Sequence, residues 1–99
     1  MATVTAYRGL EDLIQDLNNR DINRRWEAAR LLGEKGESAV DILVRKLYDD
    51  DEGIRTMALW ALGRTGSRKA LLHIERMLED EAYFVRLAGE GALQRIQGR

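Results

Sequence analysis

Three stretches of this 99-residue chain carry the same helical pattern at a nearly fixed spacing. They are RRWEAARLLGEKG from Arg24, IRTMALWALGRTG from Ile54 and VRLAGEGALQRIQ from Val85. The first two align at an offset of 30 residues, and the third follows at an offset of 31. Repeats of this length are typical of stacked arrays in which each unit packs on its neighbours. The spacing therefore predicts a solenoid, an architecture that usually presents binding surfaces.

A second set of apolar residues repeats between these stretches, with the spacing of one helical face. The set comprises Leu10, Leu13, Ile14 and Leu17, then Val40, Leu43, Val44 and Leu47, then Leu71, Ile74 and Leu78. We therefore expect an all-α fold of three antiparallel helix pairs. The six helices are expected at roughly 9–19, 21–34, 37–48, 51–64, 68–79 and 82–97. Residues 1–8 then form an N-terminal tail. The domain spans residues 9–97, with repeats at about 9–36, 37–66 and 67–97.

Cap residues mark the start of the second helix in each pair. Asp21 and Asp51 stand at N-cap positions, where a carboxylate accepts bonds from free backbone amides. Ala82 takes the third N-cap place, so Asp80 or Glu81 is expected to cap there instead. Four glycines bracket the turn out of the second helix, where a left-handed residue is needed: Gly33, Gly36, Gly63 and Gly66.

The last copy is more polar than the middle one. Glu90 stands where the earlier copies have Ala29 and Leu59, and Gln94 stands where both have glycine. Polar residues are expected at the ends of a stack, where no further repeat covers them. The pattern favours a self-contained array of three pairs, and a fragment of a longer solenoid is the alternative.

Composition argues against several classes of function. The chain has no cysteine, which excludes disulfides, thiolate metal sites and cysteine nucleophiles. Its net charge of −1 gives no global attraction to nucleic acid or to an anionic membrane. The N-terminal residues lack the apolar core of a signal peptide, and no run is long enough to span a membrane. We therefore expect a cytoplasmic protein without membrane association.

The pattern V-R-x-x-A-x-x-A-L-G-x-x-G, followed by A-V-x-x-L-x-x-x-L, resembles the short HEAT-like repeat named after phycobilisome lyases. The matching residues are Ile54, Arg55, Ala58, Ala61 to Gly63, Gly66, Ala70, Leu71 and Ile74 to Leu78, with Ala39, Val40, Leu43 and Leu47 in the preceding copy. The chain departs from the pattern at Arg24, Glu90 and Gln94, and it lacks the usual proline near Ile42 and His73. The resemblance implies a right-handed α-solenoid that binds proteins.

Two enzymatic branches are similar to this repeat. Deoxyhypusine hydroxylase binds two irons through His-Glu dipeptides, but the only histidine here, His73, is followed by Ile74. Bilin lyases form the other branch, and nothing in the sequence marks a tetrapyrrole site. The chain also has no glycine-rich phosphate loop and no nucleophile motif. We expect no catalytic residue, no cofactor and no bound metal, so the chain is predicted not to be an enzyme.

An arginine recurs at the second position of each stretch, at Arg25, Arg55 and Arg86. Two acidic runs, 49–52 and 79–81, fall in the turns within the helix pairs. Such runs can bind a divalent cation through oxygen ligands. They also stabilise helix N-termini and can pair with arginines. We favour the second interpretation and expect an arginine–aspartate ladder between neighbouring repeats, in line with the family.

Certain positions of the second helices are expected to face neither the core nor the neighbouring helices. Within each helix these positions are spaced by four residues, so they form a continuous stripe. Its predicted partner-binding residues are Trp26, Arg30, Trp60, Arg64, Tyr83, Leu87 and Arg95. In artificial binders built from the similar repeat, the matching positions form the concave surface. Trp26 aligns with Thr56, which is unusual for a core site, and the neighbours of Trp60 already fill the buried face. We therefore expect both tryptophans to be at least partly exposed, as in a contact surface.

These features predict a non-catalytic protein-interaction module or scaffold. One alternative is a small protein that forms homo-oligomers, such as a homodimer, through the same surface. Another is a nucleic-acid-binding module, because 13 of the 16 basic residues are arginine and the tryptophans could stack bases. The interspersed carboxylates and a pI near 5.8 argue against it. An accessory subunit of a bilin lyase ranks last, and the sequence does not identify the partner.

Overall fold

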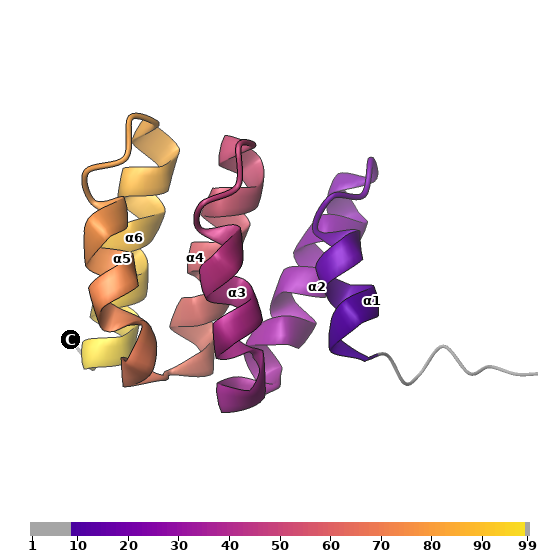
Figure 1. The fold of residues 1–99 in the computed structure, drawn as a ribbon, viewed down its shortest axis with the longest axis horizontal. Coiled ribbons are helices and arrows are strands. Elements are labelled where there is room, and N and C mark those ends of the chain that lie inside the picture. The colour runs from indigo at the N-terminus through magenta and orange to yellow at the C-terminus, as the bar shows by residue number, and fades with distance from the viewer. Residues whose placement is uncertain (1–8, 99) are drawn as a thin grey trace, which may run out of the picture.

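The computed structural model describes residues 9–98, which form three antiparallel helix pairs standing side by side (Figure 1). The six helices are α1 (Leu10–Asp16), α2 (Ile22–Glu34), α3 (Val40–Lys46), α4 (Glu52–Thr65), α5 (Leu71–Met77) and α6 (Tyr83–Gln97). The predicted all-α solenoid is confirmed. The predicted N-terminal tail, residues 1–8, lies outside the described residues. No helix within residues 9–98 has both the length and the apolar character needed to cross a membrane.

The first helix of each pair is shorter than the periodicity predicted. α1, α3 and α5 have seven residues each. Each ends in a tightened turn, because the amides of Leu17, Leu47 and Leu78 bond to carbonyls three residues back. Short 3₁₀ turns, Gly36–Ala39 and Arg68–Ala70, precede α3 and α5. The apolar period continues through these turns, and for that reason the sequence suggested longer helices.

Carboxylates cap the second helix in the first two pairs. Asp21 accepts a hydrogen bond from the Asn23 amide at 2.9 Å, and Asp51 accepts one from the Gly53 amide at 2.7 Å. Both predicted caps are confirmed. At the entrance to α6 the expected acidic cap is absent, because the N-cap residue is Ala82 and no side chain caps the first turn. Asp80 Oδ1 instead accepts from the amide of Ala82 itself at 2.9 Å, in the turn before the helix.

Leucines from both sets of helices fill one continuous core. The largest fully buried side chains are Leu13, Leu17, Leu32, Leu43, Leu47, Leu59, Leu62, Ile74, Val40 and Val85. The central helix α4 buries residues along its whole length, from Ile54 to Gly63, because a repeat lies on either side of it. This continuity makes the three pairs one packed unit.

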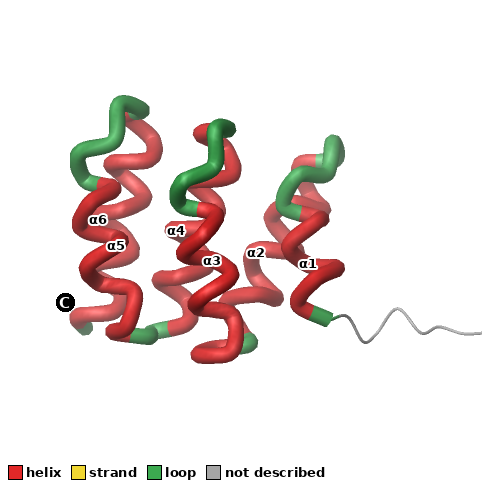
Figure 2. Tube along the Cα trace, viewed as in Figure 1, coloured by secondary structure: helices red, strands yellow, loops and turns green. Residues whose placement is uncertain are grey.

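The second helices lie closer together than the first helices. α4 packs extensively against both α2 and α6, whereas α1, α3 and α5 make slight or no backbone contact with one another. Figure 1 shows α1, α3 and α5 toward the viewer and α2, α4 and α6 behind them. Figure 2 shows the loops within the three pairs gathered at one edge of the stack. The stack therefore bends toward α2, α4 and α6, and the surface of these helices is the concave face.

Two glycines explain this close approach, a role that the sequence pattern did not predict. Gly36 and Gly66 have left-handed backbones with φ of 64° and 70°, as expected for the turns. Gly33 and Gly63 lie inside α2 and α4 instead. A Cβ on Gly33 would lie 2.6 Å from the Cβ of Arg64, and one on Gly63 would lie 3.2 Å from the Cα of Ala92. These two glycines therefore permit the contacts of α2 with α4 and of α4 with α6.

A Gly33→Ala variant is expected to lower the free energy of unfolding by about 1–2 kcal/mol, because overpacking outweighs the gain in helix propensity. Gly91→Ala is the matched control, since Gly91 also lies in a helix but a Cβ there would have no neighbour within 4 Å. It should raise stability by up to about 1 kcal/mol. Urea unfolding followed by circular dichroism would measure both changes. Equal shifts in the two variants would contradict the close approach at Gly33.

Polar residues replace apolar ones on the outward-facing sides of α2 and α6, the second helices of the first and last pairs. Arg24 is exposed, whereas its repeat equivalents Ile54 and Val85 are buried. Glu90 is exposed, whereas its equivalent Leu59 is fully buried. The Arg24 position therefore faces the preceding repeat, and the Glu90 position faces the following repeat. Each is exposed only at the end of the stack where that neighbour is missing from the described residues.

Candidate functional site

Two tryptophans from neighbouring repeats meet on the concave face. Trp26 lies on α2 and Trp60 on α4, with ring centroids 5.4 Å apart and planes at 87°. This edge-to-face arrangement is a favourable aromatic geometry. Trp26 is 40% exposed and Trp60 is 37% exposed, in agreement with the expectation of partial exposure. An apolar pair that retains this much accessible surface is typical of a contact site.

Direct contact between the two indoles was not predicted, because the repeat alignment places Trp26 beside Thr56. Thr56 is short, and its hydroxyl donates back to the Glu52 carbonyl at 2.9 Å. It leaves the space opposite Trp26 to the Trp60 ring, which lies one turn further along α4. The resulting surface is a shared patch of two repeats rather than two separate columns.

Carboxylates neutralise the arginines at the α2 side of this face. Arg30 Nη2 lies 2.7 Å from Glu27 Oε2, and Arg30 Nη1 lies 2.7 Å from Glu34 Oε2. The hydrogen bond to Glu27 and the charges of both carboxylates raise the pKa of Arg30. Arg64 stands 5.2 Å from the centre of the Trp60 ring, and its Nη2 is 3.5 Å from Glu34 Oε2. The predicted residues Trp26, Arg30, Trp60 and Arg64 are thus brought together in one place.

The remaining predicted residues lie on α6. Leu87 is 49% exposed and Arg95 is exposed. Tyr83 contacts Phe84, with ring centroids 5.3 Å apart, and Arg86 lies 5.9 Å from the Tyr83 ring. Within residues 9–98 no ring contact joins this aromatic pair to the tryptophans. Tyr83 therefore belongs to a second cluster at the start of α6.

Sequence reasoning missed Ile22, which is half exposed at the start of α2. It lies four residues before Trp26 and aligns with Tyr83 in the last repeat. That spacing was the available signal, since it continues the stripe by one turn. With Ile22 included, the apolar part of the stripe begins at the first turn of α2.

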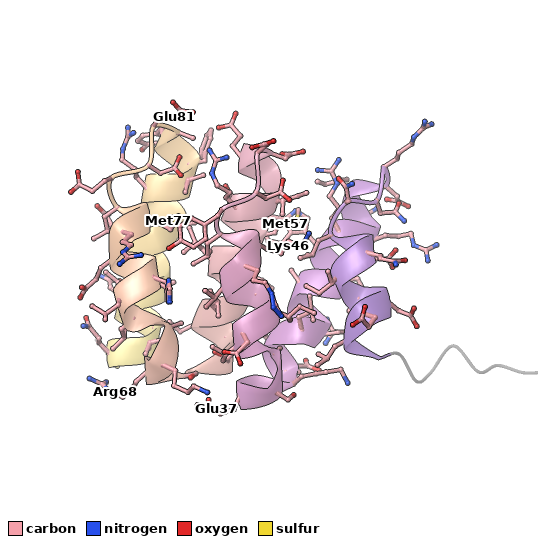
Figure 3. All side chains as sticks on the ribbon, viewed as in Figure 1. Glu37, Lys46, Met57, Arg68, Met77 and Glu81 are labelled. Atoms are coloured by element: carbon pink, nitrogen blue, oxygen red, sulfur yellow. The ribbon has the colours of Figure 1, made fainter. Side chains whose placement is uncertain are left out.

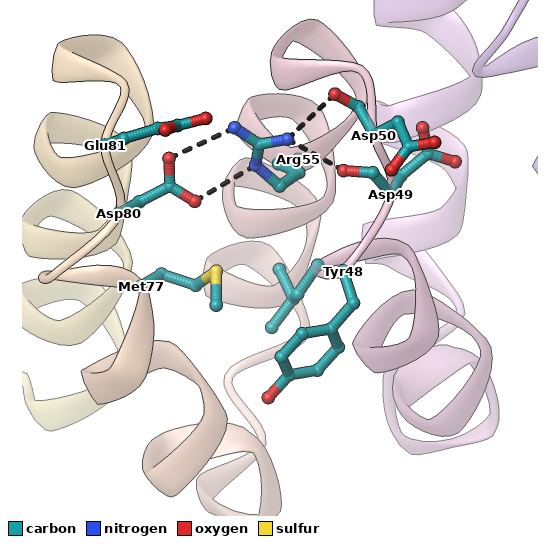
Figure 4. A pocket seen from close by; sticks show the side chains of 8 residues that line it. Tyr48, Asp49, Asp50, Arg55, Met77, Asp80 and Glu81 are labelled. Carbon is teal, nitrogen blue, oxygen red and sulfur yellow. Dashed lines mark hydrogen bonds and ion pairs between the residues drawn. The ribbon is translucent and has the colours of Figure 1, made fainter.

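A separate open pocket of about 410 Å³ lies between the turns of the second and third repeats (Figure 4). Arg55 crosses it and pairs with Asp80 through Nε and Nη2, at 3.0 and 3.1 Å. Its Nη1 donates to the carbonyls of Asp49 and Asp50 at 2.8 and 3.0 Å. The predicted arginine–aspartate contact between repeats is confirmed at this position. Figure 3 shows Glu81 at this edge of the stack, near the same turns.

The other two arginines of the column bind mainly backbone oxygens. Arg25 Nε donates to the Asn19 carbonyl at 2.6 Å, and Arg86 Nη1 donates to the Asp80 carbonyl at 2.8 Å. The column therefore fastens the turns within the pairs. Partial desolvation raises the pKa of Asp80, but the Ala82 amide and Arg55 outweigh it, so the pKa lies below its ordinary value. The pocket is a structural junction, with its central arginine already occupied.

His73 also has a structural partner. Its Nδ1 lies 3.1 Å from the Tyr48 hydroxyl, and the two rings meet at 82°. Within the described part of the chain, no group of three or more His, Cys, Asp or Glu side chains is arranged to hold a metal ion.

Comparison with known proteins points to one family. A model of HEAT repeats matches residues 10–94. The phycocyanobilin lyase subunit alpha of Nostoc sp. (strain PCC 7120) is 31% identical over 96 residues, covering 87% of this chain and 35% of that protein. A solved complex of CpcE and CpcF of phycocyanin lyase from Nostoc sp. PCC7120 matches with a TM-score of 0.73 and 30% identity, covering 98% of this chain and 40% of that chain.

The relationship to a lyase subunit is stronger than the residues alone suggested. A lyase subunit ranked last among the alternatives, because no residue marks a tetrapyrrole site, yet both the curated relative and the solved structure are lyase proteins. The chain spans about a third of the length of the curated relative. It belongs to the HEAT-repeat family and is homologous to the subunit alpha of a phycocyanobilin lyase.

Proposed function

We propose that this chain is a non-catalytic protein-interaction module that binds a partner on the concave face of α2, α4 and α6. The observation that carries the proposal is the exposed edge-to-face pair of Trp26 and Trp60, contributed by two repeats. Tryptophan and arginine supply most of the binding energy at many protein interfaces. Both residue types meet here, because Arg64 lies over the Trp60 ring.

The charge arrangement favours a protein partner over nucleic acid. A phosphate track needs a continuous row of cations. On α2 the cation Arg30 is held by Glu27 and Glu34, and Glu34 also reaches Arg64. Positive and negative side chains thus alternate on the concave face, which supports recognition of a protein surface that also carries charges of both signs.

The relationship to the lyase proteins suggests what kind of partner this is. The matched structure is a complex of two proteins, CpcE and CpcF. We propose that the partner of this chain is a protein of the CpcF kind and that the chain acts as an accessory component of a bilin-lyase assembly. This second candidate rests on the agreement of the sequence and structure comparisons.

Titration of the chain with purified CpcF from Nostoc should give a 1:1 complex with a Kd of about 1 μM or lower. Unlabelled CpcE should displace the chain, because the two would use the same surface of CpcF. Isothermal titration calorimetry would measure the affinity, and sedimentation velocity of the chain alone would report self-association.

The outcomes separate the candidates. Binding that CpcE displaces supports the accessory role. Absence of binding to CpcF removes the accessory role, and the interaction module is then tested by capture of proteins from source cells. If no captured protein depends on Trp26 and Trp60, the docking proposal is wrong. A dimer that depends on the two tryptophans supports the homo-oligomer alternative.

A further inference from the structure

On the concave face, α2 and α4 each receive an arginine from the next repeat, packed over a glycine. The Cδ of Arg64 lies 3.3 Å from the position that a Cβ on Gly33 would take. The Cδ of Arg95 lies 3.6 Å from the corresponding position on Gly63. Arg64 and Arg95 are therefore structural equivalents, each reaching back across the preceding helix.

Arg64 has two partners on this face. One is the ring of Trp60, one turn earlier on the same helix, at 5.2 Å from the guanidinium carbon. The other is the carboxylate of Glu34 on the preceding repeat, at 3.5 Å. A flat ring and a carboxylate thus accompany the cation in the second repeat.

Arg95 lacks both equivalents. The residue one turn earlier is Gly91, and the residue in the place of Glu34 is Arg64. A Cβ on Gly91 would meet nothing within 4 Å, so the surface is open there. Within residues 9–98, Arg95 forms no hydrogen bond or ion pair with another side chain. The exposed side chain of Leu87 stands one turn before Gly91, and Trp60 lies on the adjacent helix.

The positive charges of Arg64 and Arg95 are also incompletely compensated by carboxylates. Arg64 meets Glu34 at the long distance of 3.5 Å, and its buried Nε has no hydrogen-bond partner. Arg64 and Arg95 occupy equivalent positions on neighbouring helices, and within residues 9–98 no carboxylate pairs with Arg95. We give the name α6 notch to the open surface at Gly91 together with the neighbouring repeat positions Trp60, Arg64, Leu87 and Arg95.

We propose that the α6 notch binds a segment of the partner protein in which an aromatic side chain lies close to a carboxylate. The aromatic ring occupies the place over Gly91, where it stacks with Arg95 as Trp60 does with Arg64. The carboxylate accepts charge-assisted hydrogen bonds from Arg95 and Arg64. This assignment rests on the proposed function and specifies the chemistry of the segment that the concave face recognises.

A library of random twelve-residue peptides, selected by display against the wild-type chain, tests the assignment. We expect enriched peptides to place Phe, Tyr or Trp within four residues of Asp or Glu. Fluorescence anisotropy with a labelled peptide of the enriched consensus should then show at least about a tenfold loss of affinity in Arg95→Gln. Gly91→Trp should cause a similar loss, because it fills the notch with a ring of its own.

Arg76→Gln is the matched control, since Arg76 is an exposed arginine on α5, on the opposite side of the stack. Thermal unfolding of each variant checks that it is folded. The assignment is overturned if no peptide is enriched, if the enriched peptides lack carboxylates, or if Arg95→Gln and Gly91→Trp bind like Arg76→Gln. A full-length partner that requires Trp26 and Trp60 but tolerates both notch variants would leave the proposed function standing and remove the notch.

Discussion

Replacing Asp80 with alanine is expected to lower the free energy of unfolding by about 3 kcal/mol or more. The side chains of Arg55 and Asp80 are only 12% and 10% exposed, and two hydrogen bonds join them between repeats. Removal of the carboxylate leaves the positive charge of Arg55 without its partner in a partly desolvated site. It also removes the acceptor of the Ala82 amide in the turn that leads into α6, so this amide loses its hydrogen bond.

Chemical unfolding of Asp80→Ala beside Glu75→Ala would measure this effect. Glu75 is an exposed carboxylate in the middle of α5, and its replacement should change stability by less than about 0.5 kcal/mol. Asp80→Asn should fall between them, because the amide oxygen still accepts from Ala82. A loss in Asp80→Ala no larger than in Glu75→Ala would show that the pair contributes little to folding.

The contribution of Asp80 should also depend on pH in a defined direction. Desolvation raises its pKa, but the Ala82 amide, Arg55 and Arg86 together lower it by more. The folded pKa therefore lies below the ordinary value of 3.8. A carboxyl with a depressed folded pKa stabilises the fold above its unfolded pKa and loses that contribution as pH falls through the folded pKa. The stability difference between wild type and Asp80→Ala should therefore be complete near pH 7 and shrink below about pH 4.

Replacing Trp60 with alanine is expected to weaken partner binding by about 2 kcal/mol or more, which is about a thirtyfold rise in Kd. The indole lies between Trp26 and Arg64, at the centre of the surface formed by α2 and α4. Because it is still 37% exposed, its loss should reduce folding stability by only about 1–2 kcal/mol. Calorimetric titration with the partner and urea unfolding measure the two effects separately.

Tyr48→Ala is the matched control for this variant. Tyr48 is 51% exposed and meets His73 edge to face, but it lies between α3 and α5, away from the concave face. Its removal deletes an exposed aromatic ring of similar kind and should leave partner affinity within about twofold. Equal weakening by both variants would place the contact elsewhere, and outright unfolding of Trp60→Ala would show that the indole acts as core.

Much of the fold could be predicted because the sequence of each repeat can be aligned with those of the two others. The repeated apolar positions give the number and pairing of the helices, and Asp21 and Asp51 mark the starts of α2 and α4. The ends of α1, α3 and α5 could not be predicted, because a change from α-helical to 3₁₀ hydrogen bonding keeps the same side chains buried. The role of Gly33 was misjudged because glycine serves both turns and close helix contacts, and only the distance to α4 distinguishes the two uses.

The surface was predictable in its position but not in its internal contacts. Spacing by four residues identifies the stripe from a single helix. The contact of Trp26 with Trp60, by contrast, depends on the stagger of α2 against α4. The same is true of Arg64, whose guanidinium reaches Glu34 on the preceding repeat. Partner identity depends on the complementary protein, about which neither spacing nor composition carries information.

The glycines at the helix crossings have a consequence for how this surface can change in evolution. Gly33 and Gly63 determine how closely α2, α4 and α6 approach, and they do so from buried positions inside α2 and α4. A single added methyl group at either position would widen one crossing and flatten the concave face by spreading its two helices. The curvature of the proposed binding surface, and with it the shape of partner that would fit, can therefore be altered without replacing any of its exposed residues.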